Sequence, residues 1–387
     1  MELAGTEVPV VWRGRRLHAF VPRLLTDRDL ALDSAAASRC GAAALSVAHS
    51  AEALPEDYAP LARLLLRAEG IASSYIEGVQ APVVDVVLAE QDSAAQHSPA
   101  GWVAANLTAT AHATTHASST AALTVETLCD WHAALMAGSP TPARFVGRLR
   151  EEQGWIGGPS PLQAHLVTPP VTELNRLLAD LLLFTNSTDV DPVAQAAIAH
   201  AQFELIHPFA DGNGRIGRVL ISWLLTRRLR LLTPPPVSVR LAADVGGYTA
   251  GLTRYRFSQT SAWVSWFADT VSGAGSAQRE LVTAVDALGQ DWRDRLAAPR
   301  GGRVLRADAL AWRLLPLLPR HLVLTARLVA EELDVSTKAA GDALRTLVAV
   351  DVLASIDPAI TAGTGRPSHR YVSPDLLGLA GASALRR

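Results

Sequence analysis

The chain has 387 residues, of which 49% are hydrophobic and 19% are charged. These values are typical of a globular protein with two or three domains, and they exclude a disordered chain. The formal net charge of -2 gives the whole molecule no attraction to nucleic acid or acidic membranes, so any nucleic-acid role requires a local basic patch.

Helical periodicity is far more frequent along the chain than strand alternation, which predicts an all-α fold. The start is loop-rich and becomes alanine-rich by residue 50. We expect helices at 60–77, from 102 onward, and at 124–136, 172–184, 192–206, 215–231, 248–255, 261–271 and 276–296. Residues 154–170 interrupt this pattern with glycine, serine and two proline pairs. Because proline breaks helices, this segment predicts a β-hairpin or flap.

The C-terminal part has the pattern of a small separate domain. Residues 299–302 (PRGG) are typical of a linker, and two short amphipathic helices follow, capped by Thr325 and Ser336. Residues 363–370 (GTGRPSHR) look like a wing between two short strands. This arrangement resembles a winged helix-turn-helix domain.

The candidate recognition helix of this domain covers residues 336–348. It carries two basic residues, Lys338 and Arg345, and one acidic residue, Asp342. This gives only a small positive charge for binding DNA phosphates. DNA binding through residues 325–372 and a role in protein contact or dimerisation are therefore equally weighted alternatives.

Residues 207–218 (HPFADGNGRIGR) form a chemically dense loop. Gly212 and Gly214 permit positive φ, so successive N–H groups can turn toward one point. The start of a helix follows directly, which adds unpaired N–H donors and the positive end of a dipole. Arg215 and Arg218, three residues apart, share a face of that helix and bind phosphate oxygens well. The loop therefore predicts a phosphate site.

Two further side chains add reactive chemistry to this loop. Asp211 supplies a hard oxygen ligand of the kind that Mg²⁺ needs when it bridges two phosphates. His207, at the entrance of the loop, is a side chain suited to accepting a hydroxyl proton. A glycine-rich turn with solvent-facing charges is the plain alternative. Five convergent elements within one short segment favour function.

A zinc site is a rival interpretation of the same region. His200, Glu204 and His207 are spaced i, i+4, i+7, which stacks them on one helical face. Pro208 and Phe209 indicate that the helix ends near His207, which turns this side chain away. We therefore expect His200 and Glu204 to hydrogen-bond within the bundle.

Residues 207–218 match the motif HxFx(D/E)GNGRxxR of the Fic family at every fixed position. The likeness extends by eye from residue 55 to 270: residues 150–158 (REEQGWIGG) and 167–170 (VTPP) resemble the family's flap region. The resemblance implies a protein AMP-transferase that uses ATP and Mg²⁺, with a helical Fic bundle, a small flap and an appended winged helix.

The resemblance also implies a role for each residue. His207 would be the general base that deprotonates the target hydroxyl, and Asp211 would hold Mg²⁺. Arg215 would grip the β-phosphate and Arg218 the γ-phosphate. The backbone of Gly212, Asn213 and Gly214 would cradle the phosphates, together with the side chain of Asn213.

Residues 73–78 (SSYIEG) fit the family's inhibitory pattern (S/T)xxxE(G/N). Glu77 lies in the last turn of its expected helix, where the helix dipole disfavours a carboxylate by up to about 1 kcal/mol. The resemblance names Arg218 as its cationic partner, with Ser73 on the same helical face. This implies a self-inhibited member. The alternative is a solvent-facing glutamate before a capping glycine.

The resemblance assigns docking of the target protein to the flap residues Trp155, Ile156 and Gly157, where a target segment would add a strand. The acceptor would be a Ser, Thr or Tyr hydroxyl of that protein. Tyr248 and Tyr255 fall where the family places groups near adenine, and a core role is nearly as well supported by the sequence.

We expect four parts: an N-terminal helical region at 1–122, a Fic core at 123–272, a connecting helix and linker at 273–300, and the winged helix at 301–387. Two alternatives to AMP transfer remain open, a DNA-binding regulator whose Fic core senses nucleotide and a Fic enzyme that removes AMP. A homodimer also remains open.

Composition indicates the compartment. Cys40 and Cys129 are the only cysteines, which excludes a disulfide framework and suits a reducing environment. Residues 1–25 lack the apolar core of a signal peptide, and no apolar run reaches the length of a membrane span. We expect a cytoplasmic protein. Lys338 is the only lysine, which indicates a GC-rich bacterial genome.

Overall fold

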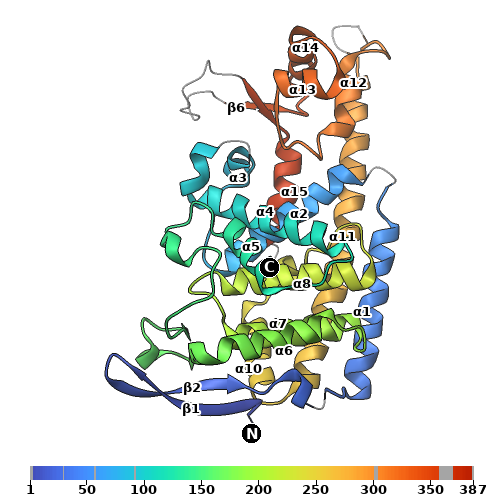
Figure 1. Cartoon of the computed structure of the whole chain (residues 1–387). Helices are drawn as coiled ribbons and strands as arrows, with labels where there is room; N and C mark the ends of the chain where they lie inside the picture. The colour runs from blue at the N-terminus through green and yellow to red at the C-terminus, as the bar shows by residue number, and fades with distance from the viewer. Residues whose placement is uncertain are drawn as a thin grey trace.

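The computed structural model describes residues 3–28, 30–55, 58–90, 93–299, 304–356 and 369–385. The described chain is mostly helical with three small sheets, so the predicted fold class is confirmed (Figure 1). Its main helices are α1 (Ser34–Glu52), α2 (Ala59–Ile76), α3 (Val83–Ala89), α4 (Pro99–Ala117), α5 (Val125–Leu135), α6 (Leu174–Asn186), α7 (Pro192–Ile206), α8 (Asn213–Leu229), α9 (Val237–Ala243), α10 (Val245–Arg256) and α11 (Thr260–Ala297).

The helices α7 and α8 lie side by side in the middle of the largest core. Nearly every residue of α7 is buried, because most of its residues are apolar or small; the polar side chains of Gln195, His200, Gln202 and Glu204 are buried with them. Asp191 caps its start by accepting hydrogen bonds from the N–H groups of Val193 and Ala194 at 2.8 and 3.1 Å. This pair of helices forms the rigid frame of the candidate site.

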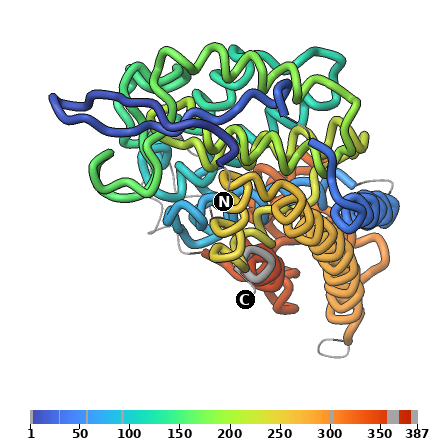
Figure 2. Tube along the Cα trace, turned by 90° about the horizontal axis from the view of Figure 1, so that it is seen from below, coloured from blue at the N-terminus to red at the C-terminus, as the bar shows by residue number. Residues whose placement is uncertain are grey.

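The first residues form a β-hairpin, where the sequence analysis expected a loop. β1 (Gly5–Trp12) pairs with β2 (Arg15–Pro22) through a turn in which Arg13 and Gly14 have φ of 47° and 77°. Two successive positive φ values are typical of the tight turns that match the twist of hairpins. In Figure 2 this hairpin, in dark blue, extends beyond the bundle beside the green flap segment, and β2 packs against β4 (Leu166–Val167).

A second difference concerns α11, which is one helix over 38 residues where two helices were expected. It therefore runs without a break past residue 272, the expected end of the Fic core. Gly275 lies against the backbone of Ser46 in α1, where a Cβ would collide. Glycine at position 275 therefore permits close packing of α1 and α11 and does not end the helix.

The C-terminal region contains a helical pair and a three-stranded antiparallel sheet with strand order β5-β7-β6. Thr325 and Ser336 cap the two helices, as predicted. The expected wing lies almost entirely outside the described residues, as does most of the expected linker. The elements are α12 (Leu310–Leu314), β5 (Val323–Thr325), α13 (Ala326–Leu333), α14 (Thr337–Val348), β6 (Ala354–Ile356), β7 (Arg370–Val372) and α15 (Pro374–Leu385).

Short segments complete the described fold. The flap contains β3 (Trp155–Ile156), paired antiparallel with β4. One-turn 3-10 helices lie at Leu25–Asp27, Ser93–His97, Ala143–Phe145, Pro161–Gln163, Val171–Glu173 and Leu315–Leu317. None of the described helices combines the length and apolarity that crossing a bilayer requires.

Candidate active site

The loop at residues 207–212 joins α7 to α8 and has two residues in the left-handed region. His207 ends α7 with φ 51° and ψ 61°, and Gly212 precedes α8 with φ 74°. The first N–H groups of α8 have no partner within the helix and face the space at this loop. A glycine turn before a helix start is therefore present, but only Gly212 has positive φ, because the helix begins at Asn213 and includes Gly214.

Asn213 holds the loop together through two hydrogen bonds to one residue. Its Oδ1 accepts from the Phe209 N–H at 2.9 Å, and its Nδ2 donates to the Phe209 carbonyl at 2.8 Å. The side chain is buried, so it is directed into the loop. This corrects the expectation that the Asn213 side chain helps to cradle phosphates: it positions the backbone that lines the site.

Replacing Asn213 by Ala would leave the N–H and carbonyl of Phe209 buried without partners, at about 1–3 kcal/mol each. We expect a lower midpoint of thermal unfolding and a loss of ATP binding. Asn186 is the matched control, because it makes the same two bonds to Leu123 at 2.8 and 2.9 Å. Asn186→Ala should lower stability and leave ATP binding unchanged. Equal loss of ATP affinity in both variants would contradict this role for Asn213.

Arg218 is buried in α8, and its Nε and Nη2 are bonded to the end of α2. Its Nε donates to the Ser73 hydroxyl at 2.9 Å, and its Nη2 donates to the Ser73 carbonyl at 2.8 Å and to Glu77 Oε1 at 2.9 Å. Burial alone would lower the pKa of Arg218, but the Glu77 carboxylate raises it on balance. The pairing of Glu77 and Ser73 with Arg218 is thus present in the geometry.

Two glycines make this approach of α2 to α8 feasible. Gly78, with φ 76°, ends α2 immediately after Glu77. A Cβ at Gly214 would collide with Glu77 Oε1 and lie 3.1 Å from Arg218 Nη1. Glycine at this position therefore lets one carboxylate, or another anion of similar size, reach the start of α8.

Arg215 is also buried, and its Nε has no hydrogen-bond partner among the described residues. Its Nη2 lies 3.7 Å from the sulfur of Met136. Burial lowers the pKa of this guanidinium. A buried cation with an unsatisfied N–H group costs free energy unless an anion binds it.

His207 carries a defined tautomer. Its Nδ1 lies 3.3 Å from the carbonyl oxygen of Glu204, and because a carbonyl only accepts, Nδ1 carries the proton. Nε2 therefore presents a lone pair. Burial, with a smaller contribution from the charge of Arg150, lowers the pKa of His207 to about 4. The imidazole is neutral at physiological pH, as a general base requires.

Arg150 positions His207 and the flap, a role that the sequence analysis did not find. Its Nε donates to the His207 carbonyl at 2.8 Å, and its Nη2 donates to the Pro169 carbonyl at 2.6 Å. Nη1 donates to the carbonyl of Glu152 at 3.0 Å. Burial lowers the pKa of Arg150 to about 10. All these acceptors are backbone carbonyls, so no charge pattern in the sequence reveals them.

His132 of α5 supports the same loop from the other side, and sequence reasoning missed it too. Its Nδ1 accepts from the Gly147 N–H at 2.9 Å, so Nε2 carries the proton and donates to the Asp211 carbonyl at 3.1 Å. The ring stacks on Phe209 with centroids 4.0 Å apart. Burial lowers the pKa of His132 to about 4, which keeps it neutral.

Asp211 is exposed at the edge of the site. Its Oδ1 accepts from the Gly212 N–H at 2.7 Å, and its Oδ2 accepts from the Thr141 hydroxyl at 2.9 Å. These bonds fix the carboxylate and leave further lone pairs directed to solvent. Among the described residues, no three His, Cys, Asp or Glu side chains converge as a metal cluster.

The zinc alternative is not supported by the geometry of these side chains. His200 is buried, and its Nε2 lies 2.8 Å from the Tyr248 hydroxyl. Burial lowers the pKa of His200 to about 3 and raises the pKa of Glu204 to about 8. His207 turns away at the end of α7, so the three candidate ligands do not converge.

The flap lies beside His207. Trp155 and Ile156 pair with β4, and Gly157 follows with φ 72°. A pocket of about 230 Å³ separates the flap from the loop and is lined by Trp155, Arg150, His207 and Phe209 among others. The ring of Trp12, in the N-terminal hairpin, meets Trp155 edge to face at 6.5 Å. The hairpin therefore backs the flap.

Tyr248 and Tyr255 lie in the core. Tyr255 is fully buried, and its hydroxyl accepts from Arg28 at 2.6 Å and donates to Gln202 at 3.0 Å. Tyr248 is buried against His200, and its ring stacks on that imidazole. Both hydroxyl groups are satisfied inside the bundle, which favours the core alternative over contact with adenine.

Comparison with known proteins agrees with this geometry. Residues 122–225 match the profile of the Fic/DOC family. The segment from 122 to 225 is therefore similar to a Fic domain. It contains α5, the flap, α7 and the start of α8, including every residue of the loop from His207 to Arg218.

Three relatives are similar to part of this chain. Protein adenylyltransferase fic-1 of Caenorhabditis elegans is 30% identical over 105 residues, 27% of this chain and 20% of its own length. A probable protein adenylyltransferase of Aquifex aeolicus is 40% identical over 57 residues, 15% of this chain and 18% of its own. Protein adenylyltransferase Fic of Drosophila willistoni is 37% identical over 83 residues, 21% and 16% of the two chains. The matches therefore span about one fifth of these relatives.

Two solved structures resemble most or part of the fold. A Fic family protein from Desulfovibrio desulfuricans G20 has a TM-score of 0.51 at 22% identity, over 89% of this chain and 97% of that one. A fragment of Fic-1 from C. elegans has a TM-score of 0.50 at 18% identity, over 65% of this chain and 74% of that fragment. These values support a shared fold.

Proposed function

We propose that this chain transfers AMP from ATP to a hydroxyl group of a protein, and that Glu77 inhibits the transfer by occupying Arg218. The observation that carries the proposal is the convergence of a neutral His207, with its Nε2 free, and the buried cations Arg215 and Arg218 at the start of α8. Similarity to protein adenylyltransferases over 105 and 83 residues supports the same reaction.

In the proposed reaction, the hydroxyl oxygen of a target Ser, Thr or Tyr attacks the α-phosphorus of ATP. A bond forms between that oxygen and the phosphorus, and the bond from the phosphorus to the oxygen bridging to the β-phosphate breaks. Pyrophosphate leaves with the electron pair. His207 Nε2 accepts the hydroxyl proton, and the N–H groups of α8 with Arg215 stabilise phosphate charge. The chain thus contributes mainly positioning and electrostatics.

Mg²⁺ fits the donor set at Asp211. This carboxylate is exposed, fixed in direction and adjacent to the N-terminal end of α8. Proteins commonly bind Mg²⁺ with one or two carboxylates, while substrate phosphates and waters complete the shell. When bound, the ion would neutralise charge on the phosphates of ATP.

The proposed brake acts through competition for one guanidinium. Glu77 and Ser73 use the Nε and Nη2 donors of Arg218, which a γ-phosphate would otherwise use. The contact is a charge-assisted hydrogen bond to a buried cation. ATP can then bind only without its γ-phosphate clamp, which misplaces the α-phosphorus for attack.

The test is transfer of label to protein by Glu77→Gly, using ATP labelled at the α-phosphorus or at the γ-phosphorus. We expect label from the α position and none from the γ position. Label only from the γ position would replace the proposal by phosphate transfer. Release of AMP from a previously modified target, without forward transfer, would favour AMP removal.

The low pKa of His207 predicts the pH profile of this transfer. Because the base acts as the neutral imidazole and its pKa is lowered to about 4, activity persists as pH falls through the ordinary range of histidine. The acid limb of kcat/KM for Glu77→Gly should lie below about pH 6.5. The profile is measured between about pH 4.5 and 8. An acid limb above 6.5 would contradict a buried, neutral base.

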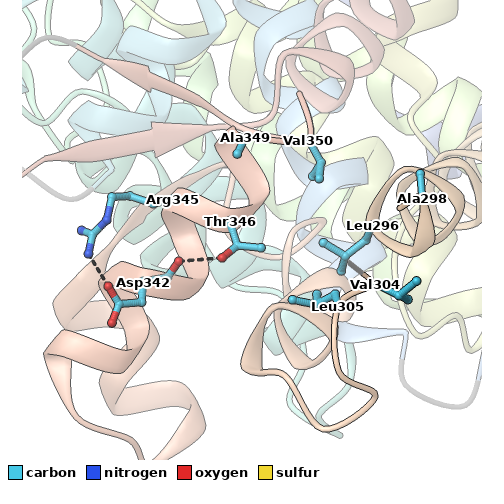
Figure 3. Close-up of a pocket in the computed structure, with 9 residues that line it drawn as sticks. All are labelled: Leu296, Ala298, Val304, Leu305, Asp342, Arg345, Thr346, Ala349 and Val350. Carbon is cyan, nitrogen blue, oxygen red and sulfur yellow. Dashed lines mark hydrogen bonds and ion pairs between the residues drawn. The ribbon is translucent and has the colours of Figure 1, made fainter. Parts of the chain in front are cut away.

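We also propose that the described residues 304–356 and 369–385 belong to a winged helix used for protein contact. Figure 3 shows Arg345 paired with Asp342 on α14, beside a groove of about 400 Å³ that Leu296 and Leu305 help to line. Arg327 pairs with Glu331 in the same way, which reduces the positive charge available to DNA. We expect no electrophoretic shift of genomic fragments. A shift that Lys338→Glu abolishes would establish DNA binding instead.

A further inference from the structure

The helix α2 belongs to two parts of the molecule. Its first half contributes Leu61, Leu64 and Leu65 to the core of the C-terminal region, which also contains Leu376 of α15. Its last turn presents Ser73 and Glu77 to the Fic domain. Among the described residues of α2, the partly buried Ile76 in the last turn packs against the large core around α7 and α8. Figure 1 shows α15, in red, next to α2.

Polar contacts hold the middle of α2 to residues of α9, of the C-terminal region and of the segment after α3. Arg67 is buried and pairs with Glu90, just after α3, with Nε 2.8 Å from Oε1. Its Nη1 also donates to the carbonyl of Arg320, in the C-terminal region, at 3.3 Å. Glu69 accepts from the N–H and hydroxyl of Ser238 in α9 at 2.7 and 2.5 Å. These contacts hold α2 between α3, α9 and the C-terminal region.

We propose that the C-terminal region controls the inhibitory contact through α2, so that a displacement of α15 draws Ser73 and Glu77 away from Arg218. The effect on activity rests on the proposed function, but the coupling of α15 to the Glu77–Arg218 contact through α2 does not. Leu65 and Ser73 lie on one continuous helix, about 12 Å apart along its axis. Bonds of 2.9 Å are lost after a shift of about 1 Å, so a small motion suffices.

The test removes packing between α15 and α2 in the full chain. Leu376→Ala deletes a fully buried side chain of α15, and Leu347→Ala is the control, because Leu347 is equally buried in the same core but lies on α14. Leu376→Val is a milder version that preserves folding. Two quantities are measured: hydrogen exchange of the Glu77, Gly78 and Val79 amides, and transfer of α-label from ATP.

We expect Leu376→Ala to accelerate exchange at these amides by at least about threefold, which Leu347→Ala does not do despite a similar fall in the unfolding midpoint. We expect transfer to rise severalfold in the otherwise unchanged chain and to stay the same in a Glu77→Gly background. Exchange that is equal in wild type, Leu376→Ala and Leu376→Val would overturn the proposal. Faster hydrogen exchange in Leu376→Ala without any transfer of label would support the coupling of α15 to the inhibitory contact and would reject AMP transfer.

Discussion

Replacing Glu77 by Gly is expected to raise AMP transfer by about tenfold to a hundredfold. The Glu77 side chain is not part of a hydrophobic core. Its removal therefore mainly frees the Nη2 of Arg218. A hydrogen bond to a charged group contributes about 1.5–3 kcal/mol, and about 1.4 kcal/mol corresponds to tenfold in a population. The rate of transfer is measured with α-labelled ATP at saturating Mg²⁺.

Glu52 offers the control for this substitution. It is the last residue of α1, as Glu77 follows the last residue of α2, and it is exposed. Glu52→Gly makes the same chemical change at a helix end without touching Arg218, so transfer should stay at the wild-type rate. Equal rates for wild type and Glu77→Gly, with ATP bound by both, would reject the inhibitory role.

The second large effect is expected for His207→Ala in the Glu77→Gly background. Loss of a positioned general base lowers the rate by about 100- to 10,000-fold. ATP affinity should change little, because Arg215, Arg218 and the N-terminus of α8 remain. Transfer rate and ATP affinity are measured separately, by label transfer and by calorimetry.

His49→Ala is the matched control for the base, because His49 is exposed on α1 and far along the chain from the loop. It should leave both transfer and ATP affinity unchanged. If His207→Ala retained the full transfer rate, another group would have to accept the hydroxyl proton, and the assignment of Nε2 would be wrong.

The sequence predicted the loop between α7 and α8 because its signals are local. Two glycines, a helix start and Arg215 and Arg218 on one face follow from spacing alone. Glu77 was predicted from a pattern as well. Its inhibitory role depends on contact with Arg218, which lies 141 residues further along the chain. A local dipole argument alone did not identify that partner.

Other parts of the site depend on long-range contacts that leave no local signal. Arg150 and His132 bind backbone carbonyl and N–H groups. Because nearly every residue type has these groups, the sequence does not identify the partners. The Asn213 side chain was assigned to phosphate because its bonds to Phe209 appear only once the loop closes. The N-terminal hairpin was missed, although Arg13 and Gly14 between apolar strands were a usable turn signal.

The assignment of α2 shows a different limit. Its apolar face, with Leu61, Leu64 and Leu65, was predicted correctly, but an apolar stripe does not say which core it joins. In the structure this stripe joins the C-terminal region, whose sequence begins more than two hundred residues later. Only the folded chain reveals that the inhibitory end and the C-terminal region share one helix.

Mass spectrometry of a protein modified by the Glu77→Gly variant tests the central claim most directly. The variant is incubated with ATP and Mg²⁺, alone and with a cell lysate, and the modified peptides are sequenced. We predict one added AMP on a Ser, Thr or Tyr hydroxyl, absent from the Glu77→Gly/His207→Ala protein. An added phosphate, or no adduct from a variant that binds ATP, would contradict AMP transfer.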